Sequence, residues 1–251
     1  MLVDERRHRI AQYVVANKVA TVAELSDEFG VSSVTSRSDL ESLERQGLLK
    51  RNHGGAVAPQ VLRFAPAFQE KTSVHLLEKQ SIAQRAAELI EDGDRVIIDS
   101  GSTTLLLARR LRDLRLTVLV NSVYTLNELV GASHIELITI GGSLFEQGMS
   151  FVGPLAELCL ERTHADKVFL GVNGVSKKGI SVNNIQEAGI KAKMISAADQ
   201  VIVLADSSKI GRDSFAYLAS LEDVDTLVTN SDIDPQMLEG LNESGMEVLV
   251  V

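Results

Sequence analysis

The sequence predicts an α/β protein of two domains: a short N-terminal head of helices and a hairpin, and a C-terminal body with a doubly wound, mostly parallel sheet. Residues 1–57 show three helical patterns followed by a turn at Gly54-Gly55. Residues 75–251 alternate short runs rich in Val, Ile and Leu with helical stretches, which is the pattern of βαβ units. Residues 58–74 contain two prolines and show no clean period, so we interpret them as a linker.

The composition is that of a packed globular protein. Of the 251 residues, 45% are hydrophobic, and no apolar run approaches the roughly 20 residues that a membrane-spanning helix needs. The charged N-terminus lacks the apolar region of a secretory signal, and the single cysteine, Cys159, provides no internal disulfide framework. The five histidines and the cysteine show no metal-ligand spacing. We therefore expect a soluble cytoplasmic protein with no membrane partner, metal or cofactor.

The distribution of charge decides whether nucleic acid is a plausible partner. The net charge of −9 at first argues against it. Residues 1–57 hold eight Lys or Arg and eight Asp or Glu, so the head is neutral and the rest of the chain carries the whole excess of acid. A neutral head binds DNA only if its basic groups converge on one face.

The head begins with a helix predicted over residues 4–17, where apolar residues recur at helical spacing. Thr21, with Glu24 three residues later, forms a capping box that opens a second helix over 22–29. Gly30 ends this helix, because glycine readily adopts the left-handed conformation.

A third helix is predicted to begin after Ser32, its N-cap, and to end at Gly47. Residues 48–57 then form two strand-like pieces around the Gly-Gly turn. This layout is typical of a winged helix-turn-helix, in which a rigid helix pair presents a recognition helix to the major groove of DNA. The apolar residues of the third helix expected to face the core are Val34, Leu40, Leu43 and Leu48.

The recognition helix and the wing carry polar and basic residues able to contact base edges or phosphates. In the wing, the missing side chains of the glycine pair would let backbone amides approach a phosphate. The plainer alternative is that Arg37 and Arg51 are solvated surface charges, as most arginines are. The candidate DNA-binding residues are Ser33, Thr35, Arg37, Ser38, Lys50, Arg51, His53 and Gly54.

Three motifs give the head a specific resemblance. They are V-x-E-L-x-x-x-F-x-V-S, T-x-R-x-D-L-x-x-L-E-x-x-G-L-L-x-R and H-G-G-A, in that order over about fifty residues. Together they resemble the N-terminal domain of the DeoR family of regulators, which implies binding to double-stranded operator DNA. Two positions depart from the family pattern, which usually has isoleucine and arginine where this chain has Ser36 and Ser38.

Each departure has a physical consequence. Ser36 lies one turn before Leu40 on the expected core side, so the lost apolar volume and the buried hydroxyl should cost about 1–3 kcal/mol. Ser38 removes a positive charge that could face a phosphate, which lowers the expected DNA affinity and its salt dependence.

In the body, seven strands are predicted, each apolar on both faces as a buried parallel strand should be. They are residues 95–99, 116–121, 135–140, 167–172, 200–205, 226–229 and 247–251. A helix over 76–90 precedes the first strand and a helix over 105–111 follows it. Four polar loops lie at the carboxyl ends of these strands, the edge at which open α/β sheets bind ligands. They are 99–104, 121–122, 141–143 and 206–209.

The loop 99–104 admits two interpretations. Small hydroxyl residues and a glycine lead from a strand into a helix, so free amides and hydroxyls converge as they do in a phosphate cradle. The same composition also suits a plain strand-to-helix turn with a good N-cap. The residues alone leave both open.

The body shows a second resemblance to the same family. The segments D-S-G-S-T-T, F-V-G-P-x-A-E, A-D-K-V-F-L-G-V-N-G and A-D-S-S-K-x-G occur in the order seen in the DeoR-family sensor domain, which is similar to ribose-5-phosphate isomerase. The resemblance covers nearly the whole chain and implies a phosphorylated sugar as effector. It assigns to the phosphate Ser100, Gly101, Ser102, Thr103 and Thr104. The other candidate effector-binding residues are Asp99, Asn121, Gly141, Gly142, Asn173, Glu187 and Lys209.

Some of these residues also admit plainer interpretations. Lys209 could be a surface lysine, and Glu187 could be an acidic residue that favours a helix N-terminus. Asn173 stands where family members often carry Asp, which would alter hydroxyl recognition.

Three other functions are compatible with parts of the sequence. A sugar-phosphate isomerase could use Asp99, Glu187 and Lys209, but an isomerase has no need of a fused winged head. A Rossmann dehydrogenase is disfavoured because no G-x-G-x-x-G follows a strand. A winged domain used only for protein contacts remains open. The expected function is a non-enzymatic repressor of a sugar-metabolism operon, a homodimer or homotetramer that a phosphorylated sugar releases from its operator.

Overall fold

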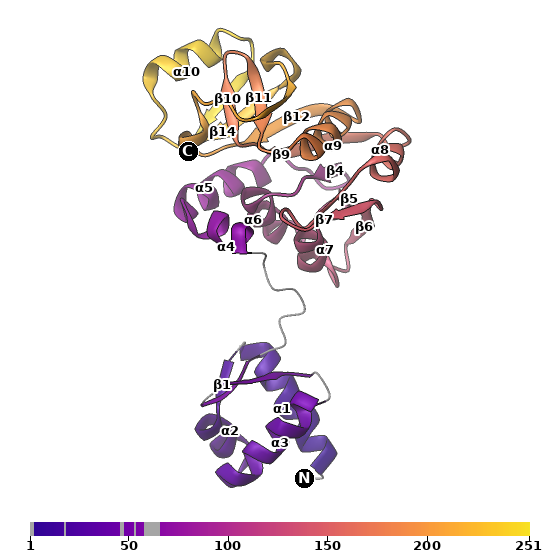
Figure 1. Cartoon of the computed structure of the whole chain (residues 1–251), viewed down its shortest axis with the longest axis vertical. Helices are drawn as coiled ribbons and strands as arrows, with labels where there is room; N and C mark the ends of the chain where they lie inside the picture. Colours follow the sequence, from indigo (N-terminus) through magenta and orange to yellow (C-terminus); the bar gives the residue numbers. More distant parts are fainter. Residues whose placement is uncertain (1–2, 18, 46–47, 53, 58–65) are drawn as a thin grey trace. The chain divides into compact units, whose positions relative to one another are not determined.

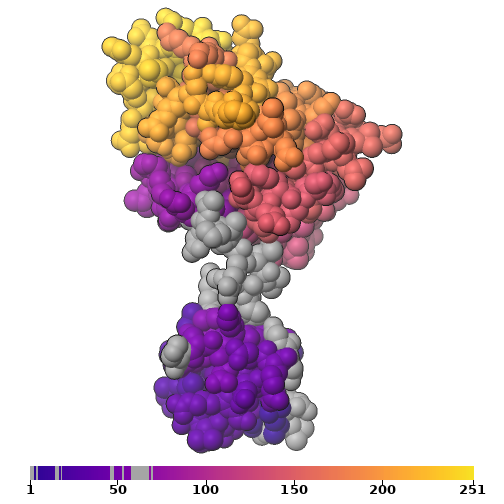
Figure 2. Space-filling view, in the orientation of Figure 1, coloured from indigo at the N-terminus to yellow at the C-terminus, as the bar shows by residue number. Residues whose placement is uncertain are grey.

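The computed structural model describes residues 3–17, 19–45, 48–52, 54–57 and 66–251. The chain divides into two compact units, Met1–Arg63 and Phe64–Val251. Figure 1 traces both units, and Figure 2 shows the atoms of the same view. Among the described residues, no helix is long and apolar enough to cross a membrane.

The head is a winged helix-turn-helix, as predicted. The side chain of Thr21 accepts a hydrogen bond from the backbone of Glu24, whose carboxylate accepts one from the Thr21 backbone, so the predicted capping box is present. Gly30 ends the second helix at φ 63°. A three-stranded antiparallel sheet of order β1-β3-β2 completes the unit. Its elements are α1 (Val3–Asn17), β1 (Val19–Thr21), α2 (Val22–Phe29), α3 (Ser33–Arg45), β2 (Lys50–Asn52) and β3 (Gly55–Val57).

Two core predictions made for the third helix are wrong, and one of them, Leu48, lies beyond the end of α3. Leu40 and Leu43 are buried as expected, but Val34 is 72% exposed and Leu48 is 44% exposed. The inner side of α3 runs through Ser36 and Leu40, and a residue two positions before Ser36 lies about 200° away around the helix. Val34 therefore faces solvent although it is apolar.

The body contains a parallel sheet of seven strands in the order β15-β14-β12-β9-β4-β5-β6. All seven strands were predicted. The chain builds from β4 toward β5 and β6 on one side, then returns to β9 and builds the other side through β12, so strand order reverses between β4 and β9. The strands are β4 (Arg95–Ile98), β5 (Leu116–Val120), β6 (Ile135–Thr139), β9 (Ala165–Gly171), β12 (Ala198–Leu204), β14 (Thr226–Thr229) and β15 (Glu247–Val250).

Helices cover both faces of this sheet (Figure 1). Successive residues of β4 point to opposite faces, because Val96 and Ile98 pack with residues of α5 and α6 while Ile97 packs with residues of α8 and α9. The sheet is therefore doubly wound, as predicted. The helices are α5 (Leu76–Ala87), α6 (Ser102–Arg110), α7 (Val123–Leu129), α8 (Pro154–Leu160), α9 (Ile185–Ser196) and α10 (Pro235–Asn242).

Several elements were not predicted. The expected linker reached residue 74, but Pro66–Ser73 form helix α4, which belongs to the body. Residues 58–65 lie outside the described residues. Short antiparallel pieces also extend the body: the hairpin β7 (Ser143–Phe145) and β8 (Ser150–Val152), and the sheet of β10 (Gly174–Ser176), β11 (Gly179–Val182) and β13 (Ala216–Ala219), with 3-10 turns η1 (Ser207–Lys209) and η2 (Leu221–Asp223).

Candidate functional site

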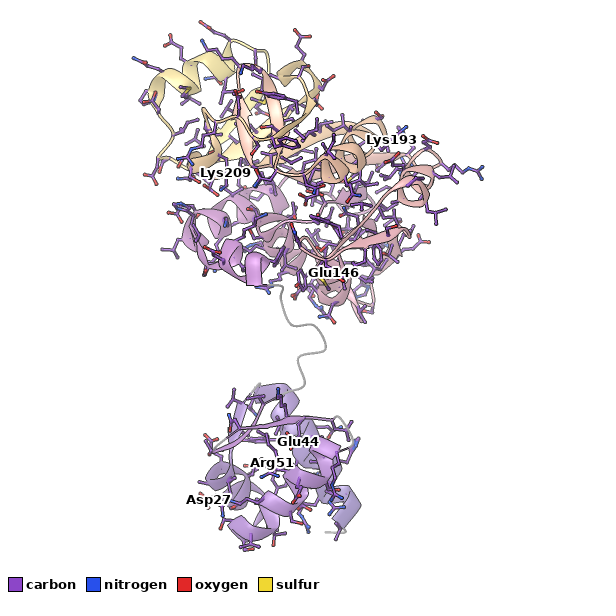
Figure 3. All side chains as sticks on the ribbon, viewed as in Figure 1. Asp27, Glu44, Arg51, Glu146, Lys193 and Lys209 are labelled. Atoms are coloured by element: carbon purple, nitrogen blue, oxygen red, sulfur yellow. The ribbon has the colours of Figure 1, made fainter. Side chains whose placement is uncertain are left out.

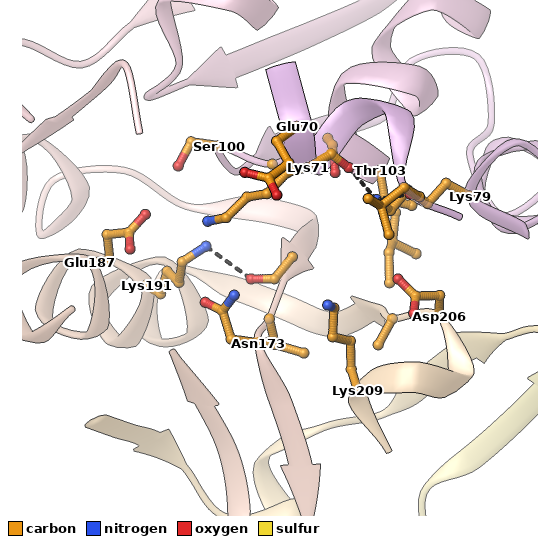
Figure 4. Close-up of a pocket in the computed structure, with 17 residues that line it drawn as sticks. Glu70, Lys71, Lys79, Ser100, Thr103, Asn173, Glu187, Lys191, Asp206 and Lys209 are labelled. Atoms are coloured by element: carbon orange, nitrogen blue, oxygen red, sulfur yellow. Dashed lines mark hydrogen bonds between the residues drawn. The ribbon is translucent and has the colours of Figure 1, made fainter. Parts of the chain in front are cut away.

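A pocket of about 230 Å³ lies at the carboxyl ends of β4, β9 and β12, where the strand order reverses (Figure 4). This is the place at which open α/β sheets bind ligands. It is lined by Glu70, Lys71, Val74, Lys79, Ser100, Gly101, Ser102, Thr103, Gly171, Val172, Asn173, Glu187, Lys191, Leu204, Ala205, Asp206 and Lys209. Seven of these were predicted from the sequence: Ser100, Gly101, Ser102, Thr103, Asn173, Glu187 and Lys209.

The loop after β4 forms one wall. Gly101 occupies the N-cap position of α6 in an extended conformation, and among the described residues no side chain caps the first turn. The amides of that turn have no partner within the helix, and the helix dipole adds partial positive charge there. Helix N-termini of this kind bind anions in many proteins, and the side-chain N-cap expected of a plain turn is not present among the described residues.

Two residues predicted to bind the effector instead stabilise this loop through hydrogen bonds outside the pocket. Thr104 is fully buried, and its hydroxyl donates to the carbonyls of Asp99 at 2.7 Å and Gly101 at 3.1 Å. The carboxylate of Asp99 accepts hydrogen bonds from the ammonium of Lys191 and from the backbone N–H of Gly171 at 3.1 Å. Neither residue lines the pocket.

Lys191 was missed by the sequence reasoning. It is 2% exposed, and its ammonium also donates to the carbonyl of Gly171 at 2.9 Å. Glu187 and Lys191 are four residues apart on α9 and therefore share one helix face. That spacing from a predicted site residue is the signal that could have identified Lys191.

Three further charged residues on α4 and α5, which were not singled out, also line the pocket: Glu70, Lys71 and Lys79. Lys79 on α5 is buried, and burial lowers the pKa of its ammonium more than the negative charge of Asp206 raises it. Lys71 on α4 extends its side chain into the pocket (Figure 4). Lys71 falls within the segment interpreted as a linker, where no pattern indicated a helix.

The loop after β12 contributes Asp206 and Lys209, as its position predicted. The Asp206 carboxylate accepts a hydrogen bond from the Ser208 backbone at 3.2 Å and one from the Ser208 hydroxyl, and this fixes the turn η1 that ends at Lys209. Lys209 is partly buried and its ammonium lies at the pocket (Figure 4), so it is not an ordinary surface lysine.

Three further predicted residues do not reach the pocket. Asn121 is fully buried, and among the described residues its side-chain amide has no hydrogen-bond partner. Gly142 has φ 131°, and a side chain there would stand 2.7 Å from the carbonyl oxygen of Val152, so packing against β8 explains this glycine. Gly141 is likewise absent from the lining.

In the head, the exposed surface of α3 carries Ser33, Arg37 and Ser38 as predicted. Thr35 is half-buried and takes part in the N-cap: its backbone donates to the Ser32 hydroxyl at 3.1 Å, and the two hydroxyls are 2.9 Å apart. Thr35 therefore helps to fix the start of the recognition helix.

Asp39 anchors α3 to α1. Its carboxylate is 1% exposed and accepts hydrogen bonds from Arg6 Nε at 2.7 Å and Arg7 Nε at 2.9 Å. The hydrogen bond to Asp39 raises the pKa of Arg6. These two arginines are thus committed to the fold rather than free for DNA.

The wing strand β2 exposes Lys50 and Arg51. The Arg51 backbone donates to Glu44 Oε1 at 2.8 Å, which ties the wing to α3 (Figure 3). The Gly54 N–H donates to Asn52 at 3.2 Å. A side chain at Gly55 would meet the Ala20 carbonyl at 2.0 Å, so strand packing, not phosphate approach, explains that glycine. His53 lies outside the described residues.

Metal binding finds no support in the part of the chain that the structure describes, where no group of three or more His, Cys, Asp or Glu residues is arranged to hold an ion.

Comparisons with known proteins agree with this architecture. The DeoR-like helix-turn-helix domain matches residues 6–61, and the DeoR C-terminal sensor domain matches residues 74–231. The HTH-type transcriptional regulator YulB of Bacillus subtilis is 41% identical over 252 residues, covering 100% of this chain and 98% of YulB. The HTH-type transcriptional repressor GlcR of B. subtilis is 34% identical, covering 100% of this chain and 97% of GlcR.

The lactose phosphotransferase system repressor of Streptococcus mutans is 31% identical, covering 93% of this chain and 94% of that repressor. Among solved structures, ribose 5-phosphate isomerase A from Methanocaldococcus jannaschii is 20% identical, with a TM-score of 0.39 over 53% of each chain. The two matched domains and the full-length relatives show that this chain belongs to the DeoR family of DNA-binding transcription regulators.

Proposed function

We propose that the protein represses a sugar-metabolism operon in the cytoplasm and leaves its operator when a phosphorylated sugar enters the pocket. The observation that carries this proposal is the uncapped N-terminus of α6, which faces a pocket lined by lysine side chains at the switch point of the sheet. The similarity to a lactose phosphotransferase system repressor supports both repression and a sugar-linked operon.

The pocket suits a ligand that combines a phosphate with hydroxyl groups. The first-turn amides of α6 and the hydroxyls of Ser102 and Thr103 are donors for phosphate oxygens. Lys71, Lys79, Lys191 and Lys209 supply positive charge around the same space. The carboxylate of Glu187 and the amide of Asn173 provide acceptors for sugar hydroxyls.

Two copies of the head, one from each of two chains, would bind the operator together. A single winged head buries too little surface for tight specific binding, so two copies of the chain should bind a repeated or palindromic site. We therefore propose a homodimer or homotetramer on double-stranded operator DNA, with α3 in the major groove.

Two measurements test the proposal together. A thermal-shift screen of the purified protein against a panel of sugar phosphates should give one class of ligand that raises the melting temperature, because binding to the folded state stabilises it. The same ligand should release the protein from the intergenic DNA next to its gene in a gel-shift assay. No stabilising sugar phosphate, or one that leaves DNA binding unchanged, would contradict the proposed effector.

Repression is tested separately. Deletion of the gene should raise transcription from the neighbouring promoter, measured with a reporter. A fall in transcription would show that the protein activates this promoter.

The isomerase alternative assigns acid–base chemistry to Asp99, and the structure disfavours it. The Asp99 carboxylate is fully buried and paired with Lys191, so it contacts no ligand in this pocket unless that pair breaks. Assaying the pure protein for aldose–ketose interconversion of the stabilising sugar phosphate tests the alternative.

A further inference from the structure

Helix α4 forms a wall of the pocket and is also the first element of the body after the residues that connect it to the head. Glu70 and Lys71 on α4, and Val74 just beyond it, line the pocket. Phe68 on the same helix is 4% exposed, and its ring centroid lies 4.5 Å from that of Tyr124 on α7. The helix is therefore packed against the body through Phe68, and it also contributes side chains to the pocket.

Lys79 connects the end of α4 to the pocket. Its ammonium donates to the backbone carbonyl of Lys71 and to that of Val74 at 2.6 Å. Carbonyl groups at a helix C-terminus lack partners within the helix, and a cation there also interacts favourably with the helix dipole. Lys79 is 5% exposed, so these two hydrogen bonds are buried. The Lys79 side chain also lines the pocket.

An ammonium group has three protons, and the two carbonyls use two of them. A phosphate at the N-terminus of α6 would accept the third. That added bond is charge-assisted and stronger than one between neutral groups, and the anion would offset the burial of the Lys79 cation. The Lys71 side chain, which extends into the pocket from α4 itself, would gain the same partner (Figure 4).

We propose that Lys79 and Lys71 bind the phosphate of the effector and thereby hold α4 in its packed position. Through α4, ligand binding in the pocket would then affect the segment that connects the body to the head. This inference rests on the proposed binding of a phosphorylated ligand in the pocket. It adds that the transmitting element is α4, and that Lys79 joins ligand and helix directly. The ligand stabilises the packed position of α4 relative to a state in which α4 is detached from the pocket. The size of this effect is the difference in the ligand's affinity for these two states.

The test is hydrogen exchange of the α4 amides in the full-length protein, with inorganic phosphate as the probe and chloride at matched ionic strength as the reference. Phosphate should slow exchange in α4 several-fold. Lys79→Met should speed α4 exchange without phosphate and abolish the response to it. Arg85→Met is the matched control, because Arg85 lies on α5 like Lys79 but does not line the pocket. In this variant, phosphate should slow α4 exchange as much as it does in the parent.

A second variant covers the case in which Lys79→Met does not fold. Lys71 is exposed, so Lys71→Met should fold normally and show a smaller phosphate response than the parent. If thermal shift shows that the parent binds phosphate but α4 exchange is unchanged, or if Lys79→Met responds like the parent, the role of α4 is wrong and the proposed ligand class stands. If the parent binds neither phosphate nor any sugar phosphate, both fail.

Discussion

Lys191 on α9 donates a hydrogen bond to the carboxylate of Asp99 at the carboxyl end of β4, and neither side chain is more than 3% exposed. The pair joins a helix on one face of the sheet to the loop that we propose as the phosphate cradle. Because Asp99 also accepts from the Gly171 backbone, three segments meet at this one carboxylate. The position of the cradle therefore depends on an ion pair beneath it.

Lys191→Met should destabilise the body by about 3–5 kcal/mol, because it leaves the Asp99 carboxylate buried without its counter-charge. The measurement is urea unfolding followed by circular dichroism. Lys193→Met is the matched control: Lys193 lies on the same helix and pairs with Glu161 at the surface, so its loss should change unfolding little. Equal effects of the two substitutions would contradict the structural role of the buried pair.

The fold of the body followed from the sequence because the inner strands of its sheet are largely buried on both faces, whereas the edge strands β6 and β15 are mostly partly exposed or exposed. Continuous Val, Ile and Leu runs identify such strands without any alternation. The pieces of the small sheet are only three or four residues long and carry no readable period, so β10 and β11 were missed. Helix α4 was missed because its short sequence, PAFQEKTS, has no amphipathic repeat, and because Pro66 was interpreted as part of a linker although proline is common at the first position of a helix.

Several residues predicted from their position after a strand line the pocket, but Asn121, Gly141 and Gly142 also follow strands and do not reach it. Of the side chains that reach the pocket from helices, Glu187 was predicted and others were not. Ser100 and Lys209 lie in loops at the sheet edge, and topology alone places them together. Lys79 and Lys191 reach the pocket from helices, and which helical side chain points there depends on tertiary packing. Val34 in the head shows the same limit. Its apolar side chain indicated burial, but its angular position on α3 places it on the solvent side of the helix.

A pH dependence is expected from Asp166 at the start of the central strands. Arg95 on β4 donates to its carboxylate, and this hydrogen bond lowers the pKa of Asp166 from 3.8 to about 2. A carboxyl with a lowered pKa in the folded state stabilises the fold above its unfolded pKa and loses that contribution as the pH falls through the folded value.

Asp166→Asn should therefore reduce the free energy of unfolding at neutral pH, and the difference from the parent should shrink as the pH falls from about 4 toward 2. Urea unfolding over a pH series measures this. Arg95→Gln should give the same pH dependence, since it removes the other partner of the pair. A difference that stays constant with pH would contradict the shifted pKa.

The buried Ser36 calls for a corrected expectation. The sequence indicated that the buried Ser36 hydroxyl would lower the stability of the head. In the structure this hydroxyl has a partner, because Ser36 Oγ lies 3.0 Å from Ser26 Oγ. The Ser26 hydroxyl also donates to the Val22 carbonyl at 2.7 Å. Ser36→Ile should then lower the stability of the head by about 1–3 kcal/mol, because the larger side chain would meet Ser26 at a fully buried position. Ser26→Ala with Ser36→Ile should recover part of the loss in thermal unfolding. A single Ser36→Ile that raises the melting temperature would show that the site has spare volume.

DNA reading by α3 is testable at Arg37. This exposed side chain lies on the surface of the recognition helix, where a bidentate contact to guanine is the commonest specific contact of arginine. Arg37→Ala should weaken specific binding by about 1–3 kcal/mol, whereas Arg51→Ala in the wing should weaken specific and random DNA alike. Titrations of both DNAs by fluorescence anisotropy separate the two. An equal loss on both DNAs for Arg37→Ala would remove its base-reading role.

The exposure of Val34 adds a prediction of its own. An apolar side chain that is 72% exposed at the start of the recognition helix is suited to contact a thymine methyl group. Val34→Ser should keep the stability of the head, since no core contact is lost, and should weaken operator binding. Replacing thymine by uracil at the contacted position should weaken the parent and leave Val34→Ser unchanged. If uracil substitution at every operator thymine leaves the parent unaffected, Val34 reads no methyl group.

The last prediction concerns the cradle itself. Thr103 lies in the first turn of α6, is 6% exposed and lines the pocket. Thr103→Glu should place a carboxylate where the phosphate belongs, and should exclude the ligand by charge and by bulk. The head is untouched, so operator affinity should be retained while release by every sugar phosphate is lost, which is a permanently repressing phenotype. Thr103→Val is the matched control, because it keeps the volume and adds no charge; it should still respond, at a higher ligand concentration. Gel shifts with increasing ligand measure both variants. If Thr103→Glu releases DNA at the ligand concentration that releases the parent, the phosphate binds elsewhere and the N-terminus of α6 is not its site.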